Sequence, residues 1–350
     1  MERLGARSFP STTMEEKLRL HEFILKYYDL ISFGIKLVKD LRKQPISSSF
    51  ATTFFLKNNK LESLRDEIDG IDSKIVGLLN QRVQAAAKIG SIKNELGVDP
   101  YDPAREEQVF EKLENLNTGP LHKDSLRIIY REVISASIAL EKKLIIGYLG
   151  PEATYTHQAA VNNFGSTLDY HALPDIPDVF QAVEKGECDY GVVPIENSTE
   201  GAVNRSLDLL VETELTIIAQ VYLKVEHSLF SFSPIDSITE VRSKDQALAQ
   251  CGEWLRRNLP NAQLIPVTST AEAVKSLKPD TKTGAIAGKL AGRIYGVPSQ
   301  ADSIQDRKNN VTRFLVVARK PLPKREEVNY RTSLVLSLPD QVGALKAALK

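Results

Sequence analysis

The feature that most constrains the fold is a series of residues between positions 61 and 96 that recur alternately three and four positions apart. The series is Leu61, Leu64, Ile68, Ile71, Ile75, Leu78, Arg82, Ala85, Ile89, Ile92 and Leu96. Residues at this spacing share one face of an α-helix, so the series predicts a single helix of about 35 residues and about 50 Å in length. A helix this long needs other helices to cover its apolar face.

Two shorter helices are predicted after it. Asp102 followed by Pro103 is typical of a helix start, because it supplies an N-cap and then a proline in the first turn. A turn at 118–120 separates this helix from a third one over 123–143. These segments together predict an all-α domain over 58–143.

At Leu144 the pattern changes to short apolar runs that alternate with helical segments. This alternation predicts an α/β domain over 144–320, in which helices cover the sheets. Strands are predicted at 144–149, 189–195, 215–223, 225–232, 264–267, 283–287 and 313–318. Helices are predicted at 154–164, 178–185, 202–212, 245–258, 270–277 and 288–294.

Residues 1–57 are predicted to be an N-terminal extension of unknown role. An amphipathic helix is predicted at 17–44, which suits packing against a partner and, less well, binding to a membrane surface. A targeting peptide fits less well, because acidic residues recur and no compact apolar segment with a cleavage site is present.

Residues 321–350 are predicted to hold a linker and the beginning of a small third domain. The linker starts at Pro321 and Pro323. A strand over 332–338 and a helix from Gly343 follow it. The chain is therefore expected to be multidomain, with a third domain that is cut short.

Composition excludes several classes of function. Lys and Arg number 45 and Asp and Glu number 45, for a net charge of +0, so no overall field attracts nucleic acid or anionic lipid. No uncharged apolar run approaches the roughly 18 residues of a membrane span. Cys188 and Cys251 fit no zinc or iron–sulfur spacing, and so few cysteines are typical of a reducing compartment. We therefore expect a cytoplasmic protein with no metal site built on thiolates.

Arg82 stands where the helical series requires an apolar residue. A guanidinium on a buried face cannot lose its charge, so it needs a fixed anion, either from the protein or from a ligand. Lys93 lies close to the same face about 16 Å further on, so the two cations could hold a small dianion between them. Arg65 lies about 25 Å before Arg82, too far to share that ligand unless a second chain brings it over. Internal ion pairs with nearby carboxylates are the alternative, and spacing alone does not decide.

The helical segment resembles the all-helical chorismate mutases in five motifs. They are L-x-x-L-R-x-x-I-x-x-I-D at 61–72, L-L-x-x-R at 78–82, I-G-x-x-K at 89–93, D-P-x-R-E at 102–106 and I-S-A-S at 134–137. The resemblance implies an intertwined homodimer that binds chorismate and rearranges it to prephenate. It assigns Arg65 of a second copy, Arg82 and Arg105 to the carboxylates, and Lys93 to the ether oxygen. It places Asp102 and Glu106 near the ring hydroxyl and Ser137 near a carboxylate.

Glu141 departs from the family pattern, which often has a glutamine that donates to the ether oxygen. A carboxylate must be protonated to donate a hydrogen bond. We therefore expect mutase activity to fall as the pH rises through the pKa of Glu141, unless burial lifts that pKa above neutrality.

A polar loop follows one of the predicted strands in the α/β segment. It reads Glu196, Asn197 and Ser198 after a buried strand, and the carboxyl ends of strands are where α/β sheets bind ligands. Thr312 and Arg313 pair a hydroxyl with a guanidinium at the start of the last strand. They could protonate a leaving group and hold a carboxylate, or they could be an ordinary strand edge.

Residues 144–320 resemble prephenate dehydratase. The resemblance rests on V-P-I-E-N-S-T-E-G-A-V at 193–203, Q-A-L-A-Q-C at 246–251 and N-x-T-R-F at 310–314. It implies two α/β lobes like those of a periplasmic binding protein, with prephenate between them and no cofactor. The roles that it implies are proton donor or orienter for Thr312, carboxylate anchor for Arg313, and cleft lining for Glu196, Asn197, Ser198, Ser243 and Gln250.

Two positions depart from this second pattern. Lys244 stands where the family usually has histidine, and Ala153 stands where glycine is usual. His157 and His227 match family positions, and we predict a structural role for both.

Residues 330–345 resemble the start of an ACT regulatory domain, a family that binds phenylalanine at a dimer interface. L-Phenylalanine is therefore a candidate effector, although the family's later E-S-R-P segment has no counterpart. The sequence as a whole predicts a bifunctional chorismate mutase/prephenate dehydratase of phenylalanine biosynthesis. The alternatives are a monofunctional dehydratase whose helices serve dimerisation or sensing, and a dicarboxylate sensor without activity.

Overall fold

A computed structural model describes residues 48–279, 281–322 and 330–349 of the chain. The predicted helix at 17–44 and most of the linker lie outside the described residues. Two compact units are present, Met1–Leu78 and Leu79–Lys350. Within the described ranges, no helix combines the length and the apolar character needed to cross a membrane.

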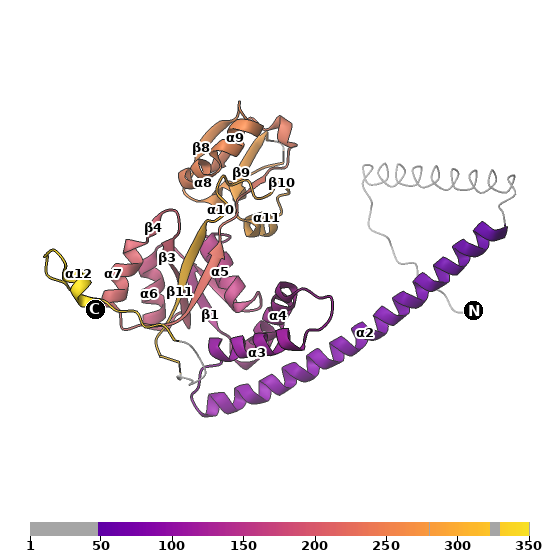
Figure 1. Ribbon diagram of the computed structural model, residues 1–350, viewed down its shortest axis with the longest axis horizontal. Coiled ribbons are helices and arrows are strands. Elements are labelled where there is room, and N and C mark those ends of the chain that lie inside the picture. Colours follow the sequence, from indigo (N-terminus) through magenta and orange to yellow (C-terminus); the bar gives the residue numbers. More distant parts are fainter. Residues whose placement is uncertain (1–47, 280, 323–329, 350) are drawn as a thin grey trace, which may run out of the picture. The chain divides into compact units, whose positions relative to one another are not determined.

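Among the described residues, three helices precede the first strand, in agreement with the three predicted for the all-α domain (Figure 1). They are α2 (Ser48–Glu95), α3 (Pro103–Leu116) and α4 (Lys123–Glu141). Asp102 caps α3, because its carboxylate accepts a hydrogen bond of 3.0 Å from the backbone N–H of Arg105, and Pro103 follows in the first turn. The long helix begins earlier than the apolar series indicated.

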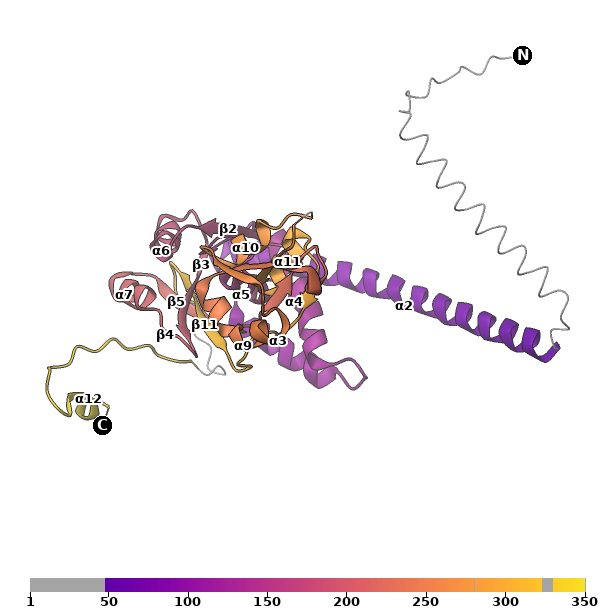
Figure 2. The same ribbon diagram turned by 90° about the horizontal axis from the view of Figure 1, so that it is seen from above.

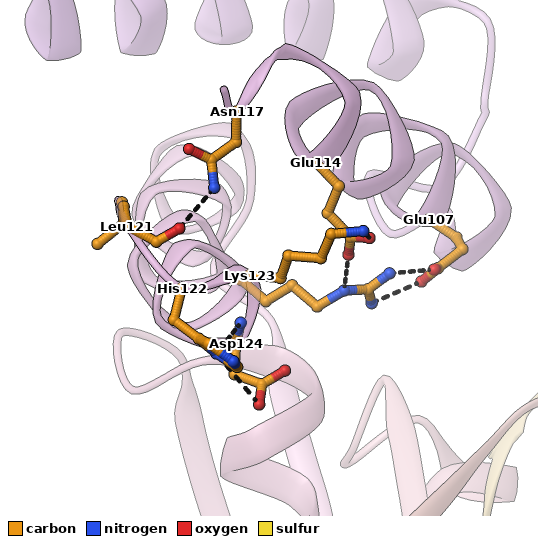
Figure 3. A network of polar contacts seen from close by, with 8 residues as sticks. Glu107, Glu114, Asn117, Leu121, His122, Lys123 and Asp124 are labelled. Carbon is orange, nitrogen blue, oxygen red and sulfur yellow. Dashed lines mark hydrogen bonds and ion pairs between the residues drawn. The ribbon is translucent and has the colours of Figure 1, made fainter. Parts of the chain in front are cut away.

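Ion pairs hold α3 and α4 together near the turn that connects them (Figure 3). Arg127 on α4 donates to Glu107 at 2.6 Å and also to Glu114, both on α3. Beyond them, Asn117 donates to the carbonyl of Leu121 at 2.7 Å, which closes the turn. These contacts fix the hairpin through partly exposed polar groups, so its position also depends on apolar packing.

The first α/β lobe contains a sheet with the strand order β2-β1-β3-β11-β5, and β4 pairs with β3. Its strands are β1 (Ile145–Leu149), β2 (Asp169–Leu173), β3 (Tyr190–Asn197), β4 (Gly201–Ala202), β5 (Thr216–Lys224) and β11 (Val311–Ala318). β1 is parallel to β2 and β3, whereas β11 runs antiparallel to β3 and β5. Its helices are α5 (Tyr155–Phe164), α6 (Ile176–Lys185) and α7 (Asn204–Glu212).

The second lobe contains a five-stranded sheet with the order β10-β6-β9-β7-β8. This lobe is drawn in orange tones in Figures 1 and 2. Its strands are β6 (Ser228–Phe230), β7 (Glu240–Ser243), β8 (Gln263–Pro266), β9 (Thr283–Ala287) and β10 (Ser299–Ala301). Its helices are η1 (Ile235–Ser237), α8 (Asp245–Gln250), α9 (Gly252–Asn258), α10 (Thr270–Lys275) and α11 (Lys289–Tyr295). The predicted two-lobed α/β architecture is thus confirmed.

The predicted strand over 332–338 is wrong. Residues 330–339 pair with no other strand among the described residues, and only α12 (Ala344–Ala348) follows. Leu334 and Val335 are 74% and 69% exposed. A strand needs a neighbour to satisfy its backbone N–H and C=O groups, and apolar alternation alone does not provide one.

One core joins the helical hairpin to the first lobe. Tyr101, Phe110 and Ile134 are buried in the same cluster as Tyr148 and Phe164. The rings of Tyr101 and Phe164 lie 4.6 Å apart between their centroids, a distance typical of a packed aromatic pair. Apolar burial therefore fixes α3 and α4 against the sheet that carries the candidate site.

Candidate active sites

A cavity of about 710 Å³ lies between the two α/β lobes. The first lobe contributes to its lining Leu149, Gly150, Pro151, Thr154, Tyr155, Thr156, Pro174, Ile176, Pro194, Asn197, Glu200, Gly201, Ala202, Val203, Val225, Asn310, Thr312 and Phe314. The second lobe contributes His227, Lys244, Gln246, Ala247, Gln250, Thr268, Ser269, Thr270 and Glu272. We call this space the interlobe cavity. It has the size and the mixture of apolar and polar walls that small-molecule sites have.

Thr312 lies opposite Asn197 in the pairing of β11 with β3. The amide nitrogen of Asn197 donates to the Thr312 hydroxyl oxygen at 2.8 Å. The amide oxygen of Asn197 accepts from the backbone N–H groups of Thr199 and Glu200, at 2.9 and 3.1 Å. Backbone N–H groups can only donate, so the orientation of the Asn197 amide is fixed. The Thr312 hydroxyl therefore accepts from Asn197 and keeps its own hydrogen for another acceptor.

Gln250 connects the two lobes at the cavity wall. Its amide nitrogen donates to Glu200 at 3.3 Å, and its amide oxygen accepts from Asn310 at 3.2 Å. Asn310 in turn accepts from Asn197 at 2.8 Å. The predicted residues Asn197, Gln250 and Thr312 thus come together through Asn310, to which the sequence reasoning gave no role.

Four other predicted residues do not line the interlobe cavity. Ser243 is fully buried and donates to the carbonyl of Ile286 at 2.6 Å, which ties β7 to β9. The hydroxyl of Ser198 accepts from the backbone N–H of Val311 at 2.9 Å and so closes the end of β3.

Glu196 and Arg313 are the other two, and they alternate with Asn197 and Thr312 along β3 and β11. Successive side chains on a strand point to opposite faces, so Arg313 turns away from the face that carries Thr312. A guanidinium nitrogen of Arg313 lies 3.8 Å from a carboxylate oxygen of Glu196, and its buried Nε has no hydrogen-bond partner among the described residues. Arg313 lines a separate cavity of about 420 Å³ together with Asp102, Arg331 and edge residues of β5.

The two departures from the second family pattern have physical consequences. Ala153 has φ of 68°, in the left-handed region that favours glycine, which explains why glycine suits this position. Lys244 is exposed and lines the interlobe cavity.

The two family histidines differ in their surroundings. His157 accepts from the backbone N–H of Ala153 at 3.0 Å and stacks on Tyr148 at 4.5 Å. His227 contacts Gln250 at 2.9 Å and so reaches the cavity network. Burial lowers the pKa of both histidines.

On the helices, Arg82 donates to the hydroxyl of Ser137 at 3.0 Å and is half-buried. Lys93 donates to the carbonyl of Pro100 at 2.8 Å. Neither Arg82 nor Lys93 has a carboxylate within ion-pair distance among the described residues. The alternative that both cations form internal ion pairs is therefore not what the structure has. Both keep donor capacity for a further anion.

Glu141 lies close to Lys93 and to α2. Burial raises the pKa of Glu141, and the charge of Lys93 partly opposes this rise. Its Oε2 is buried and has no hydrogen-bond partner among the described residues. Gly90 on α2 makes this approach possible, because a Cβ there would lie 2.8 Å from the Glu141 Cβ and overlap its Cγ.

The remaining predicted residues of the helices differ in burial and in their partners. Glu106 is 8% exposed and forms an ion pair with Arg131, and burial raises its pKa while Arg131 opposes the rise. Arg105 is exposed and donates to Gln108 at 3.2 Å. Arg65, in the Met1–Leu78 unit, pairs with Glu62 at 2.7 Å, and both side chains are more than half exposed.

Among the described residues, no three His, Cys, Asp or Glu side chains are grouped closely enough to hold a metal ion. Cys188 and Cys251 are both buried and free.

Comparison with known proteins identifies two families along the chain. A family model described as prephenate dehydratase matches residues 146–322, and one described as chorismate mutase type II matches residues 64–142. A bifunctional chorismate mutase/prephenate dehydratase of Aquifex aeolicus is 42% identical over 296 residues, which cover 83% of this chain and 81% of that protein. The protein of the same description from Neisseria gonorrhoeae is 43% identical over 290 residues, with 82% and 79% covered.

One solved structure supports the fold of the α/β region. The prephenate dehydratase of Arthrobacter aurescens in complex with L-Phe has a TM-score of 0.51 and 29% sequence identity. The match covers 59% of this chain and 71% of that one.

Proposed function

This chain belongs to the bifunctional chorismate mutase/prephenate dehydratase family, and we propose that the residues described above form its two active sites. It converts chorismate to prephenate and prephenate to phenylpyruvate, two steps of phenylalanine biosynthesis. The observation that carries the assignment of the second site is the hydrogen bond of 2.8 Å from Asn197 to Thr312 in the interlobe cavity. The first step belongs to the helical domain over 58–143 and the second to the domain over 144–320.

The mutase step needs no nucleophile, because it is a pericyclic rearrangement. The site accelerates it by holding the reactive conformer and by stabilising negative charge on the ether oxygen as the carbon–oxygen bond breaks. Arg82 and Arg105 bind carboxylates of the substrate, and Lys93 donates to the ether oxygen. Support comes from the half-buried Arg82 with its contact to Ser137 at 3.0 Å. Asp102 and Glu106 lie toward the ring hydroxyl.

Glu141 is the second donor to the ether oxygen in this proposal. It acts in its protonated form, which its raised pKa favours. Its buried Oε2, which has no partner among the described residues, is available for the substrate. Lys93 then supplies the permanent charge and Glu141 the neutral hydrogen bond.

The dehydratase step releases carbon dioxide and water from prephenate as the ring becomes aromatic. The electron pair of the breaking carbon–carboxylate bond moves into the ring, and the ring hydroxyl leaves from the opposite end. Thr312 donates its proton to that departing hydroxyl, which takes the electron pair of the carbon–oxygen bond and leaves as water, and solvent returns a proton to the Thr312 oxygen. The hydrogen bond that Thr312 accepts from Asn197 leaves its own hydrogen free for this step. Gln250 and Glu200 line the same cavity, whereas Glu196, Ser198, Ser243 and Arg313 lie outside its lining.

We propose that the active protein is a homodimer and that Arg65 completes the mutase site of a second copy. The apolar series on α2 supports this, since Leu64, Ile68 and Ile71 are 48%, 56% and 47% exposed. An apolar stripe of this length on a helix needs a covering partner. The partner in this proposal is the same segment of another chain.

L-Phenylalanine is the proposed effector, through an ACT domain of which residues 321–350 are part. Support comes from the sequence resemblance and from the Arthrobacter aurescens neighbour, whose structure is a complex with L-Phe. We place the protein in the cytoplasm, where two free cysteines stay reduced.

A coupled assay tests the two activities together. Chorismate is supplied to the purified protein, and phenylpyruvate is measured by its ultraviolet absorbance in alkali. We expect prephenate to appear first and phenylpyruvate to follow. Phenylpyruvate from added prephenate but not from chorismate would instead indicate a monofunctional dehydratase, and ligand binding without turnover would indicate a sensor.

A further inference from the structure

The hydrogen-bond network of the interlobe cavity extends beyond the predicted site residues to His227. This residue lies between β5 and β6, where the chain passes from the first lobe to the second, and it is 2% exposed. Its Nε2 lies 2.9 Å from the amide oxygen of Gln250, and its Nδ1 lies 2.7 Å from the hydroxyl of Tyr155. The network therefore includes a buried histidine that the reaction itself does not use.

The direction of each hydrogen bond in this network follows from one fixed point. The amide oxygen of Asn197 accepts backbone N–H groups, so its nitrogen faces Asn310 and donates to the oxygen there at 2.8 Å. The nitrogen of Asn310 then faces Gln250 and donates to the Gln250 oxygen at 3.2 Å. That oxygen can only accept, so Nε2 of His227 must carry a hydrogen.

From these hydrogen-bond directions we infer that His227 is a positioning residue for the dehydratase step. Its Nε2–H and the Asn310 amide together occupy the oxygen of Gln250, so the Gln250 nitrogen is held toward Glu200 and the cavity. Tyr155 holds the histidine from the other side: its hydroxyl lies 2.7 Å from Nδ1 and 2.9 Å from the carbonyl oxygen of Glu226. With the hydrogen of the neutral ring on Nε2, Nδ1 and this carbonyl are both acceptors and share the single hydroxyl hydrogen. Burial lowers the pKa of His227 and raises the pKa of Tyr155, which favours the neutral ring and the protonated phenol. The inference rests on the proposed role of the interlobe cavity.

Three variants and one spectrum test the role of His227. His227→Leu removes the donor, and we expect kcat for prephenate to fall about 10- to 100-fold, as for a misplaced catalytic group, while KM changes by less than about threefold. Mutase activity stays unchanged. His227→Gln offers an amide donor to the Gln250 oxygen and recovers part of kcat. Tyr155→Phe leaves the donor but loosens the ring, so its effect is smaller than that of His227→Leu.

The control variant is His171→Leu, since His171 is exposed on β2 and lies outside the cavity. It should leave both activities unchanged. Nitrogen-15 NMR of histidine-labelled wild-type protein should find the hydrogen of His227 on Nε2. If His227→Leu does not fold, this measurement on the wild-type protein tests the inference in its place. A hydrogen on Nδ1, or a folded His227→Leu with wild-type kcat, overturns the inference. A wild-type protein that does not consume prephenate would refute the proposed function instead.

A separate observation concerns the charge of the same cavity. Prephenate is a dianion, yet Arg313 faces away from the cavity. Among the described lining residues, Lys244 is the one with a permanent positive charge, and Glu200 and Glu272 are negative. The ammonium group of Lys244 has no carboxylate partner within the described residues. A site for a dianion with two carboxylates in its own wall needs at least one cation to offset their repulsion.

We propose that Lys244 binds the side-chain carboxylate of prephenate, the one that the product retains. A cation held tightly to the ring carboxylate would stabilise the substrate more than the transition state and oppose the loss of carbon dioxide. A cation on the retained carboxylate binds substrate and product alike. Lys244 therefore sets affinity rather than the rate of the chemical step.

Lys244→Met tests this assignment against Lys244→Arg, which keeps the charge. We expect Lys244→Met to raise KM for prephenate about tenfold, as for one lost charge-assisted hydrogen bond, with kcat changed less than about threefold. The inhibition constant of phenylpyruvate rises by the same factor. Lys282→Met, at an exposed lysine outside the cavity, is the matched control and should change neither value.

Two results overturn the proposal for Lys244. One is an unchanged KM for prephenate in Lys244→Met, which would show that Lys244 does not bind the substrate. The other is a raised KM with an unchanged phenylpyruvate constant, which assigns the lysine to the ring carboxylate. Both presuppose a wild-type protein that turns prephenate over, so they are distinguishable from failure of the proposed function.

Discussion

The site between the α/β lobes and the site on the helices differ in how much of each a single chain supplies. In the α/β region, Thr312, Asn197 and Gln250 come from three distant parts of the sequence and belong to one hydrogen-bonded network. On the helices, Arg82 contacts Ser137, whereas the partner of Arg65 in the described part of the chain is its neighbour Glu62. Two lobes of one chain can enclose a substrate, whereas the exposed apolar face of a long helix leaves room for the second copy that we propose.

The largest expected effect is on the dehydratase step, from a substitution at Thr312 in the interlobe cavity. Thr312→Val keeps the shape of the side chain and removes the hydroxyl, so the departing group loses its proton donor. We expect kcat of the dehydratase step to fall about 10³-fold, within the range for loss of general acid catalysis. Mutase activity in the same preparation is the control, and a parallel loss of both activities would contradict separate sites.

The next prediction concerns the sharing of the mutase site between chains. Arg65→Ala and Arg82→Ala should each reduce mutase activity about 100-fold or more, because a carboxylate of the dianion loses its charged partner. If one chain supplies Arg65 and the other Arg82, a mixed dimer of the two variants has one intact site. After unfolding and refolding an equal mixture, about a quarter of the wild-type activity should return, as two-fold symmetry requires.

The control for this mixture is each variant refolded alone, which should recover no activity. Dehydratase activity should remain near the wild-type value in all samples. If the mixture is no more active than its components, both arginines act within one chain, and the difference between the two regions disappears.

The next prediction concerns the pH dependence of mutase activity, which Glu141 should control and which separates the mutase site from the dehydratase site. The protonated form is the donor, so mutase activity should be present below the pKa of Glu141 and lost as the pH rises through it. Because burial raises this pKa, the loss falls above the usual range for a glutamate. Glu141→Gln cannot ionise and should remain active across the range from about pH 5 to pH 8. The prediction fails if wild type and variant both give a flat profile.

The smallest expected effect is at the contact between α2 and α4. Gly90→Ala places a methyl group against the side chain of Glu141, which must shift. We expect the free energy of unfolding to fall by about 1–3 kcal/mol, as for an overpacked contact, with a several-fold loss of mutase activity. Thermal unfolding measures the change in stability, and the mutase and dehydratase assays measure the two activities. Ala87→Gly, elsewhere on α2, controls for helix propensity. A changed dehydratase rate in Gly90→Ala would contradict the prediction.

Elements marked by a cap or by an apolar run could be predicted from the sequence, and elements without such a mark could not. The helix starting at Pro103 and the strand β1 agree with prediction, because a cap or an apolar run marks each of them. β2, β4, β7 and β10 were missed, since their sequences contain no apolar run that would mark a strand. The helix predicted at 245–258 is two helices with a break at Cys251.

The candidate site was predictable where a motif holds its residues together. Thr312 and Asn197 were named from motifs and face each other in the structure. Arg313 stands in the same motif but lines another cavity, because alternation along β11 turns it to the opposite face. Asn310 was quoted within that motif without a role, and its contact with Gln250 joins residues 60 positions apart.

The sequence alone determined the helical and α/β regions, the boundary near Leu144 and the family to which each region belongs, because periodicity and motifs are local properties of the chain. The tertiary structure decided which predicted residues meet: it joined His227 to Gln250 and placed Lys244 rather than Arg313 at the interlobe cavity. The physical reason is that a hydrogen bond or a charge acts over a few ångströms of space, and distance along the chain does not measure that space.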